Sequence, residues 1–293
     1  MFGPRRYLPS IPSLLALEAV DRLGTATAAA NELSLTHSAV SRQIKVMEGQ
    51  IGVKLVVRDG VGLKLTPAAH DYCGQIRAML ADLSQNTLRL RANPAGGSLN
   101  LAILPAFGMH WLAPRLKSFA VEHPEVTVNL STRLRPFDFD REPLDAAIHY
   151  GAQDWPGVGY LRLAGEELLP VCAPSFLAKP LASVADLTDL PLLHLETRSG
   201  AWQDWFGRQG VSVGAVPGML FDQFSTMAQA AVHGMGVALL PDYLAQSEIA
   251  RGRLTSAFGS PTHTDGQYFL VWPEQAPIKP QVEKFMTWIV GTL

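Results

Sequence analysis

Cysteine is scarce in this sequence: Cys73 and Cys172 are the only two, they stand far apart, and neither belongs to a metal-ligating pattern. This excludes a disulfide framework and predicts two reduced thiols of a cytosolic protein. Long apolar runs are also missing, because none approaches the roughly 20 residues that a membrane-spanning helix requires. We therefore expect a protein of the cytoplasm without a membrane segment.

Signatures of catalysis are missing as well. The chain has no G-x-S-x-G, H-E-x-x-H, paired C-x-x-C or P-loop pattern. Its eight histidines are scattered, and no two of them have the i, i+3 or i, i+4 spacing with which a helix chelates a metal ion. Gly234-Met235-Gly236 precedes an expected strand instead of a helix, which is not the context of a nucleotide-binding loop. The sequence thus predicts no enzyme, no metal and no cofactor.

What the chain does contain is apolar material for two or three domains and an uneven charge. It has 293 residues, 47% of them hydrophobic, and a net charge of −2. The first 92 residues hold 11 Lys and Arg against 7 Asp and Glu, whereas the remainder holds 13 against 19. A basic N-terminal end fits a nucleic-acid partner. Pro9 and Pro12 interrupt the apolar stretch after Arg5-Arg6, which favours a lead-in to the first helix over a signal peptide.

Residues 27–47 have the pattern of two short helices joined by a tight turn. Thr27 is expected to cap an alanine-rich helix that runs to Leu33, and Ser34-Leu35 is too short for anything but a turn. Thr36 is expected to cap the second helix, because its hydroxyl can accept an orphan N–H of the first turn. The second helix has one apolar stripe, formed by Val40, Ile44 and Met47.

The opposite face of the second helix is polar and basic, which suits a helix that lies in the major groove of DNA. We expect His37, Ser38 and Ser41 to contact bases, and Arg42 and Lys45 to contact bases or phosphates. Candidate contacts outside this face are a phosphate contact from Thr36 and a further DNA contact at Thr27.

A basic hairpin follows the two helices. Residues 55–58 and 63–66 are expected to form two short strands around a turn at 59–62, whose glycines supply unusual φ angles. Arg58 and Lys64 would then reach the DNA backbone or the minor groove. An ordinary helical hairpin with a solvated basic face is the alternative, and the wing at this position favours a winged helix-turn-helix instead.

This order of elements resembles the N-terminal signature of LysR-type transcriptional regulators. The resemblance extends over essentially the whole chain, and its N-terminal motif residues are Ala28-Ala29, Leu33, Ala39 to Ile44, Glu48, Gly52 to Leu55, Arg58 and Leu65-Thr66. In two departures, His37 stands where glutamine is common and Val56 stands where phenylalanine is common. The first leaves the base preference open, and the second is a packing change. The family also contains peroxide-sensing disulfides, which is the alternative role for the two cysteines.

A long helix is expected from Pro67 to about Leu90, because proline suits the first helical position. Spacings of three and four residues along it form a heptad seam of Tyr72, Ile76, Met79, Leu83, Asn86 and Leu90. The seam predicts a dimerisation helix, with packing on its own domain as the alternative. Residues 93–98 are expected to form a hinge. The expected domains are therefore 1–66, 67–92 and 93–293.

After the hinge the pattern changes to alternating strands and helices. Strands are expected at 99–104, 126–130, 146–150, 168–173, 192–195, 237–240 and 267–272, and helices at 111–123, 185–187, 227–232 and 280–290. Such α/β alternation predicts a mostly parallel sheet. Because the chain crosses out near 165 and returns near 267, two subdomains are expected, about 98–165 with 268–293 and about 166–267. This half resembles the family's effector domain, which looks like a periplasmic binding protein.

Ligands of such folds bind at the carboxyl ends of strands, beside helix N-termini. The candidate effector-binding residues after four expected strands are Ala106, Phe107, His110, His149, Tyr150, Glu196, Phe224, Ser225 and Thr226. Arg133 or Arg135 is a candidate cation. The family often has a hydroxyl residue where Ala106 stands, and His110 is a candidate to compensate for its absence. Packing against the sheet is the alternative for His149 and Tyr150, as N-capping is for the two hydroxyl residues.

These patterns together predict a cytoplasmic LysR-type regulator. The resemblance implies that it binds an interrupted palindrome in double-stranded DNA as a homodimer or homotetramer, under the control of a small effector such as an organic anion. RNA polymerase is a further candidate partner. Residues 119–124 (F-A-V-E-H-P) and 146–151 (A-A-I-H-Y-G) most resemble the glycine-cleavage and β-lactamase regulator branch. The alternative is a constitutive DNA-binding protein whose C-terminal half serves only assembly.

Overall fold

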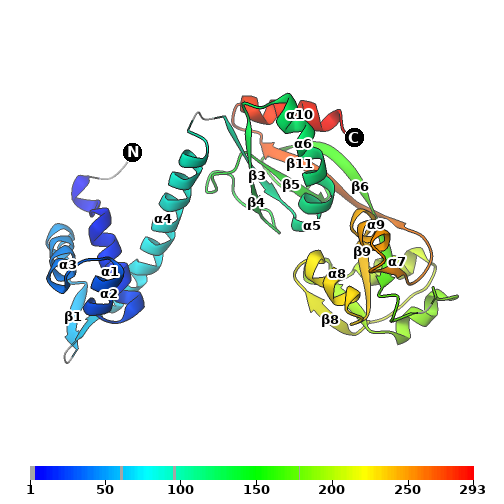
Figure 1. Cartoon of the computed structure of the whole chain (residues 1–293), viewed down its shortest axis with the longest axis horizontal. Coiled ribbons are helices and arrows are strands. Elements are labelled where there is room, and N and C mark those ends of the chain that lie inside the picture. The colour runs from blue at the N-terminus through cyan, green and yellow to red at the C-terminus, as the bar shows by residue number, and fades with distance from the viewer. Residues whose placement is uncertain (1–3, 60–61, 95–96, 178) are drawn as a thin grey trace. The chain divides into compact units, whose positions relative to one another are not determined.

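The computed structural model describes residues 4–59, 62–94, 97–177 and 179–293, which form two compact units divided after Pro94 (Figure 1). The first unit contains η1 (Arg5–Tyr7), α1 (Ile11–Leu23), α2 (Ala26–Glu32), α3 (His37–Ile51), β1 (Val56–Asp59), β2 (Gly62–Leu65) and α4 (Pro67–Ala92). No helix in the described part of the chain is long and apolar enough to cross a membrane.

The expected helix-turn-helix is present, but its first helix begins earlier than the sequence suggested. Gly24 ends α1 in the left-handed conformation (φ 75°), and Thr25 then caps α2 by accepting a hydrogen bond from the N–H of Ala28 at 3.1 Å. Thr27, which was expected to be the cap, lies in the first turn and is exposed. The prediction was wrong because two threonines compete at this point, and only Thr25 has the extended backbone of a cap.

Glu48, near the end of α3, joins that helix to the wing. Its carboxylate is buried, accepts hydrogen bonds from the N–H groups of Leu55 (2.9 Å) and Val56 (3.3 Å), and forms an ion pair with Lys54 (2.9 Å). Strands β1 and β2 pair antiparallel, as expected for a wing. The expected hairpin turn includes residues 60–61, which lie outside the described residues.

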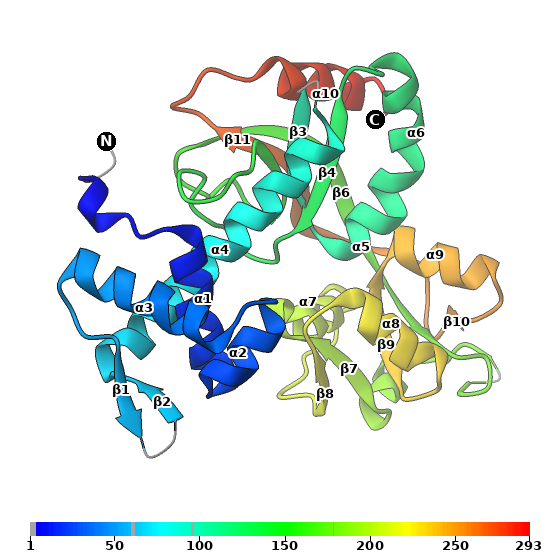
Figure 2. The same ribbon diagram turned by 60° about the vertical axis from the view of Figure 1, so that its left-hand side comes forward.

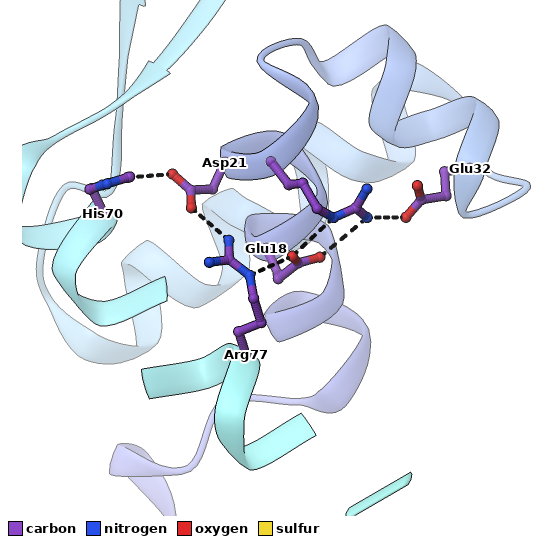
Figure 3. A network of polar contacts seen from close by, with 6 residues as sticks. Glu18, Asp21, Glu32, His70 and Arg77 are labelled. Atoms are coloured by element: carbon purple, nitrogen blue, oxygen red, sulfur yellow. Dashed lines mark hydrogen bonds and ion pairs between the residues drawn. The ribbon is translucent and has the colours of Figure 1, made fainter. Parts of the chain in front are cut away.

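The first turns of α4 belong to the core of the first unit (Figure 3). Arg77 of α4 donates to Glu18 (3.0 Å) and Asp21 (2.9 Å) of α1, and His70 Nδ1 lies 2.7 Å from Asp21 Oδ1. Ile76 is fully buried against the same core. The early part of the expected heptad seam therefore packs within its own unit, because α1 lies against it.

The second unit contains β3 (Ser98–Ile103), α5 (Pro105–Phe107), η2 (Gly108–Leu112), α6 (Ala113–Glu122), β4 (Thr127–Thr132), β5 (Ala146–Gly151), β6 (Val158–Cys172), η3 (Val184–Asp189), β7 (Leu192–Leu195), η4 (Glu196–Arg198), α7 (Ala201–Arg208), β8 (Gly218–Phe221), α8 (Phe224–Val232), β9 (Val237–Pro241), α9 (Asp242–Ala250), β10 (Thr255–Ser256), β11 (Thr262–Pro273) and α10 (Pro280–Val290). We call β3 to β5 with α5, α6 and α10 the first lobe, and β7 to β10 with α7 to α9 the second lobe. The long strands β6 and β11 run through both lobes (Figures 1 and 2).

The sheet of this unit is mixed, so the expectation of a mostly parallel sheet was wrong. Its order is β4-β3-β5-β11-β6-β9-β7-β8, with β10 beside β6. The four pairs within the lobes, β3–β4, β3–β5, β7–β8 and β7–β9, are parallel. The pairs that β6 and β11 make are antiparallel, because these two strands carry the chain back and forth between the lobes. The carboxyl ends of the parallel strands still lie together in each lobe.

Apolar layers cover both faces of each lobe. In the first lobe, α6 and α10 pack on one face, where the rings of Phe119 and Phe285 lie 5.3 Å apart, while Phe139 and Trp155 stack on the other face. In the second lobe, α8 and α9 cover one face and α7 covers the other. Both lobes are thus rigid supports for the loops at the ends of their strands.

Candidate functional site

Helix α3 presents a polar face away from the core of the first unit. Val40, Ile44 and Met47 are buried as expected, and Thr36 accepts a hydrogen bond from the N–H of Ala39 at 3.2 Å as the cap. The candidate DNA-binding residues on the outer face are therefore open to a partner, with Thr36, His37, Ser38, Arg42 and Lys45 exposed and Ser41 partly buried.

The turn before α3 is tight for a stated reason. Ser34 has a left-handed backbone (φ 53°), and the N–H of Leu35 bonds back to the carbonyl of Ala30 at 2.8 Å. These bonds fix where α3 leaves α2. Of the two wing residues predicted to reach DNA, Lys64 is exposed on β2, whereas the Arg58 side chain lies outside the part of the structure that is described.

A cleft opens at the strand ends of the second unit, formed by two cavities that share Leu104, Leu134, Thr197 and Arg198. The larger, of about 310 Å³, lies at the carboxyl ends of β3, β4 and β5, and the smaller, of about 50 Å³, is bounded by the segments that follow β3, β7 and β8. This is the position where open α/β sheets bind ligands.

Five of the nine candidate effector residues line this cleft. The larger cavity is lined by His149 and Tyr150, and the smaller by Ala106, Phe107 and Phe224. His149 is also tightly packed, since its Nε2 lies 3.1 Å from the carbonyl oxygen of Ala152. Packing and ligand contact therefore coexist at this position.

The other four candidates do not line either cavity. Glu196 is exposed and pairs with Arg135 at 3.5 Å, while Ser225 and Thr226 bond to Gln223 in the first turn of α8. His110 lies near Glu248 and Arg251, and burial lowers the pKa of its imidazole. The list of candidates to replace the missing hydroxyl at Ala106 must therefore look beyond His110.

The residue that occupies the centre of the cleft is Arg198. Its guanidinium carbon lies 3.6 Å from the centre of the Tyr150 ring and 4.7 Å from that of Phe224, and the group forms an ion pair with Glu166. The Glu166 side chain is completely buried, whereas 15% of the Arg198 side chain remains accessible. Arg198 thus ends in a slot between two aromatic rings, with one carboxylate behind it.

Two tyrosines complete the support of this ion pair. Tyr268 donates to Glu166 Oε1 at 2.5 Å, and Tyr243 lies 3.0 Å from the Tyr268 hydroxyl. Since Tyr268 uses its single proton on Glu166, Tyr243 is the donor in the second bond. Burial raises the pKa of Tyr150 to about 12 and raises the pKa of Tyr243 and Tyr268 further. All three phenols therefore stay protonated and act as hydrogen-bond donors.

The sequence patterns missed both members of the pair, although each leaves a trace. Glu166 is a carboxylate within the long strand β6, whose following residues are almost all apolar and buried. Arg198 comes three residues after the end of β7, at the strand end where a ligand group is expected. Their partnership was not predictable, because the sheet register brings together positions 32 residues apart.

A winged helix-turn-helix joined to a two-lobed α/β unit with a cleft defines a ligand-responsive transcription regulator. Residues 11–70 match the family described as bacterial regulatory helix-turn-helix protein, lysR family, and residues 92–293 match the LysR substrate binding domain. The chain therefore belongs to the LysR family of transcriptional regulators.

Known relatives agree with this assignment and with the expected branch. The chain is 36% identical to the glycine cleavage system transcriptional activator of Escherichia coli K12, covering 98% of this chain and 94% of the relative. It is 35% identical to the transcriptional activator AmpR of Rhodobacter capsulatus, covering 97% and 98%. The effector domain of Pseudomonas aeruginosa AmpR superposes with a TM-score of 0.60 at 30% identity, over 67% of this chain and 94% of that structure. The family is one of regulators and not of enzymes, as expected.

Proposed function

We propose that this regulator works in the cytoplasm, binds an interrupted palindrome as a homodimer or homotetramer through α3, and responds to a small carboxylate held by Arg198. The observation that carries the effector part is the slot of Arg198. The DNA part is supported by the exposed basic face of α3.

The oligomer is supported by apolar side chains that α4 leaves uncovered. Beyond Ile76, the residues Met79, Leu83 and Leu90 of the expected seam are exposed, as is Leu88 beside them. An amphipathic helix with such a stripe is stabilised when a second copy covers it. Two copies of α3 related by a twofold axis would then read two half-sites.

Arg198 suits a carboxylate because most of its donors are unused. A guanidinium has five N–H donors, and among the described residues Arg198 makes one hydrogen bond, from Nη1 to Glu166. Buried polar groups normally find partners, so the remaining donors favour an acceptor that enters the cleft. A planar carboxylate matches the fork of the guanidinium in two parallel bonds.

Asp222 narrows the class of effector further. It lines the smaller cavity and has no ion-pair or hydrogen-bond partner within the described residues. A ligand that also carries an ammonium group would supply the missing positive charge. We therefore propose that the effector is a small carboxylate, and that one bearing an amine binds more tightly than its plain analogue.

The DNA assignment is tested by an electrophoretic mobility shift on the intergenic DNA beside the regulator's own gene, across a salt series. Arg42→Ala should weaken specific binding by more than about ten-fold, since a good base contact contributes about 1–3 kcal/mol. Lys117→Ala, which removes an exposed charge from α6 of the second unit, is the matched control and should leave affinity unchanged. Unchanged affinity of the Arg42 variant would contradict the role of α3.

The effector assignment is tested by calorimetric titration with alanine, propionate and isopropylamine. We expect alanine to bind best and the amine alone to bind worst. Arg198→Lys keeps the charge but loses the planar fork, so affinity for both carboxylates should fall by about ten-fold. Replacing Ser225 and Thr226 by alanine should reduce the response on DNA without changing basal binding. If no carboxylate binds or shifts the melting temperature, the constitutive DNA-binding alternative gains.

A further inference from the structure

The second unit has a further cavity that is distinct from the cleft. It measures about 280 Å³ and lies between α7 and the segment 262–266 of β11, and among its lining residues are Tyr150, Leu168, Arg198, Asp204, Trp205 and Gly266. Its volume is close to the lower end of the range for small-molecule sites, roughly 300 Å³. Only Tyr150 and Arg198 belong to the walls of both the cleft and this cavity.

The charges that line this cavity are paired, with one exception. Arg198 is paired with Glu166, Arg208 with Asp265 at 2.5 Å, and His263 with Glu167 at 3.0 Å. These three pairs leave no excess positive charge in the walls. An anion therefore has no uncompensated partner here.

The exception is Asp204. It lies in the first turn of α7, and within the described part of the chain its carboxylate has no ion-pair or hydrogen-bond partner. Its Oδ2 lies 3.8 Å from the place where a side chain would begin on Gly200, which also lines the cavity. The helix N-terminus supplies only about half a positive charge. The carboxylate is thus left under-compensated beside an open space.

The rest of the wall is apolar and aromatic. Leu168 and Trp205 are buried at the cavity, and the indole N–H of Trp205 has no acceptor in the described structure. Trp202 and Phe206 pack against Trp205 with ring centres 5.9 and 5.4 Å away, which holds the indole in place. Such a wall suits the hydrocarbon or aromatic body of a ligand.

We infer that this cavity is a second ligand site, which takes a small organic cation: an ammonium group on Asp204 and an apolar body against Trp205. The site is independent of the effector assignment, because its charge argument uses Asp204 and not Arg198. A ligand there would contact Tyr150 and Arg198 from behind. Binding at this site and in the cleft would therefore be coupled, and the coupling would be reciprocal.

The test is calorimetric titration of the full-length protein with benzylammonium chloride. Benzyl alcohol is the neutral analogue of the same shape, and benzoate is the anionic one. We expect saturable binding of the cation, with the alcohol weaker by about ten-fold or more, the factor expected for one charge-assisted hydrogen bond. No binding of the cation up to about 10 mM, a concentration equivalent to roughly 3 kcal/mol, would overturn the proposal.

Variants locate the bound cation. Asp204→Asn should weaken benzylammonium to the level of the alcohol, whereas Asp189→Asn, an exposed charge change at the end of η3 in the same lobe, should leave it unchanged. Ala201→Phe should abolish binding by filling the cavity. Thr197→Val alters the cleft alone and should have no effect. The proposal fails if Asp204→Asn binds like the parent, or if Thr197→Val abolishes binding. Should Ala201→Phe not fold, the Asp204 variant decides.

Discussion

The ion pair between Glu166 and Arg198 is the most sensitive point of the second unit, and Glu166→Gln is the substitution that probes it. The Glu166 side chain has no exposure, and only 15% of the Arg198 side chain is exposed. Burial alone would lower the pKa of Arg198, but attraction to Glu166 outweighs it and the pKa is raised. Removing the carboxylate charge therefore leaves a cation that cannot easily lose its proton.

The size of the effect follows from the cost of an unpaired buried charge. Removing one partner of a buried ion pair costs about 3–5 kcal/mol. In a unit of roughly 200 residues, each kcal/mol shifts the melting temperature by about 2–4 °C. Glu166→Gln should therefore lower the melting temperature of the second unit by about 6–20 °C.

A double variant separates the charge from the loss of packing. Glu166→Gln with Arg198→Met removes both charges while it keeps an acceptor for Tyr268, so it should recover most of the lost stability. The assay is thermal unfolding at pH 7 followed by tryptophan fluorescence, with circular dichroism as a second probe. A shift of less than about 2 °C for the single variant, or a double variant as unstable as the single one, would refute the reasoning.

Two further predictions concern the titrating groups of both units. Burial would raise the pKa of Glu48, but hydrogen bonds from Leu55, Lys54 and Val56 outweigh it, and the pKa lies below its ordinary 4.5. Its contribution to stability is therefore present above about pH 4.5 and is lost as the pH falls through the lowered pKa, so Glu48→Gln should flatten the loss of stability between about pH 5 and 3. Burial raises the pKa of Cys73 to about 12 and that of Cys172 to about 11. At pH 8 neither thiol should react with iodoacetamide until the chain is unfolded, as mass spectrometry would show; rapid labelling of the native protein would instead support a redox role.

Features set by local chemistry could be predicted from the sequence. Helix α4 begins at Pro67 and α10 spans Pro280–Val290 as expected, because a proline at the first position and an apolar period of 3.6 are properties of a few neighbouring residues. Strand β7 also has its expected bounds, since a short apolar run between polar residues fixes both ends. The start of α2 could not be predicted, because both Thr25 and Thr27 satisfy the local rule for a cap.

Features set by pairing across the chain were beyond the sequence patterns. The first half of β6, from Val158, alternates irregularly and was not expected to be a strand, yet β11 pairs with it along most of its length. The same pairing places Glu166 beside Tyr268 and makes the sheet mixed. Ser225 was a reasonable candidate by position, but its hydroxyl is 3.4 Å from Gln223 in the first turn of α8 and faces neither cavity of the cleft.

The location of the Arg198 slot suggests how an effector would act on the second unit. Glu166 belongs to β6 and Tyr268 to β11, the two strands that both lobes share, whereas Arg198 belongs to the second lobe alone. A carboxylate that takes the donors of Arg198 competes with Glu166 and weakens the tie between the second lobe and those strands. A ligand shifts a conformational equilibrium only by its difference in affinity for the two states. The strength of the Glu166–Arg198 pair therefore sets how much of the binding energy of an effector is available to move the lobes.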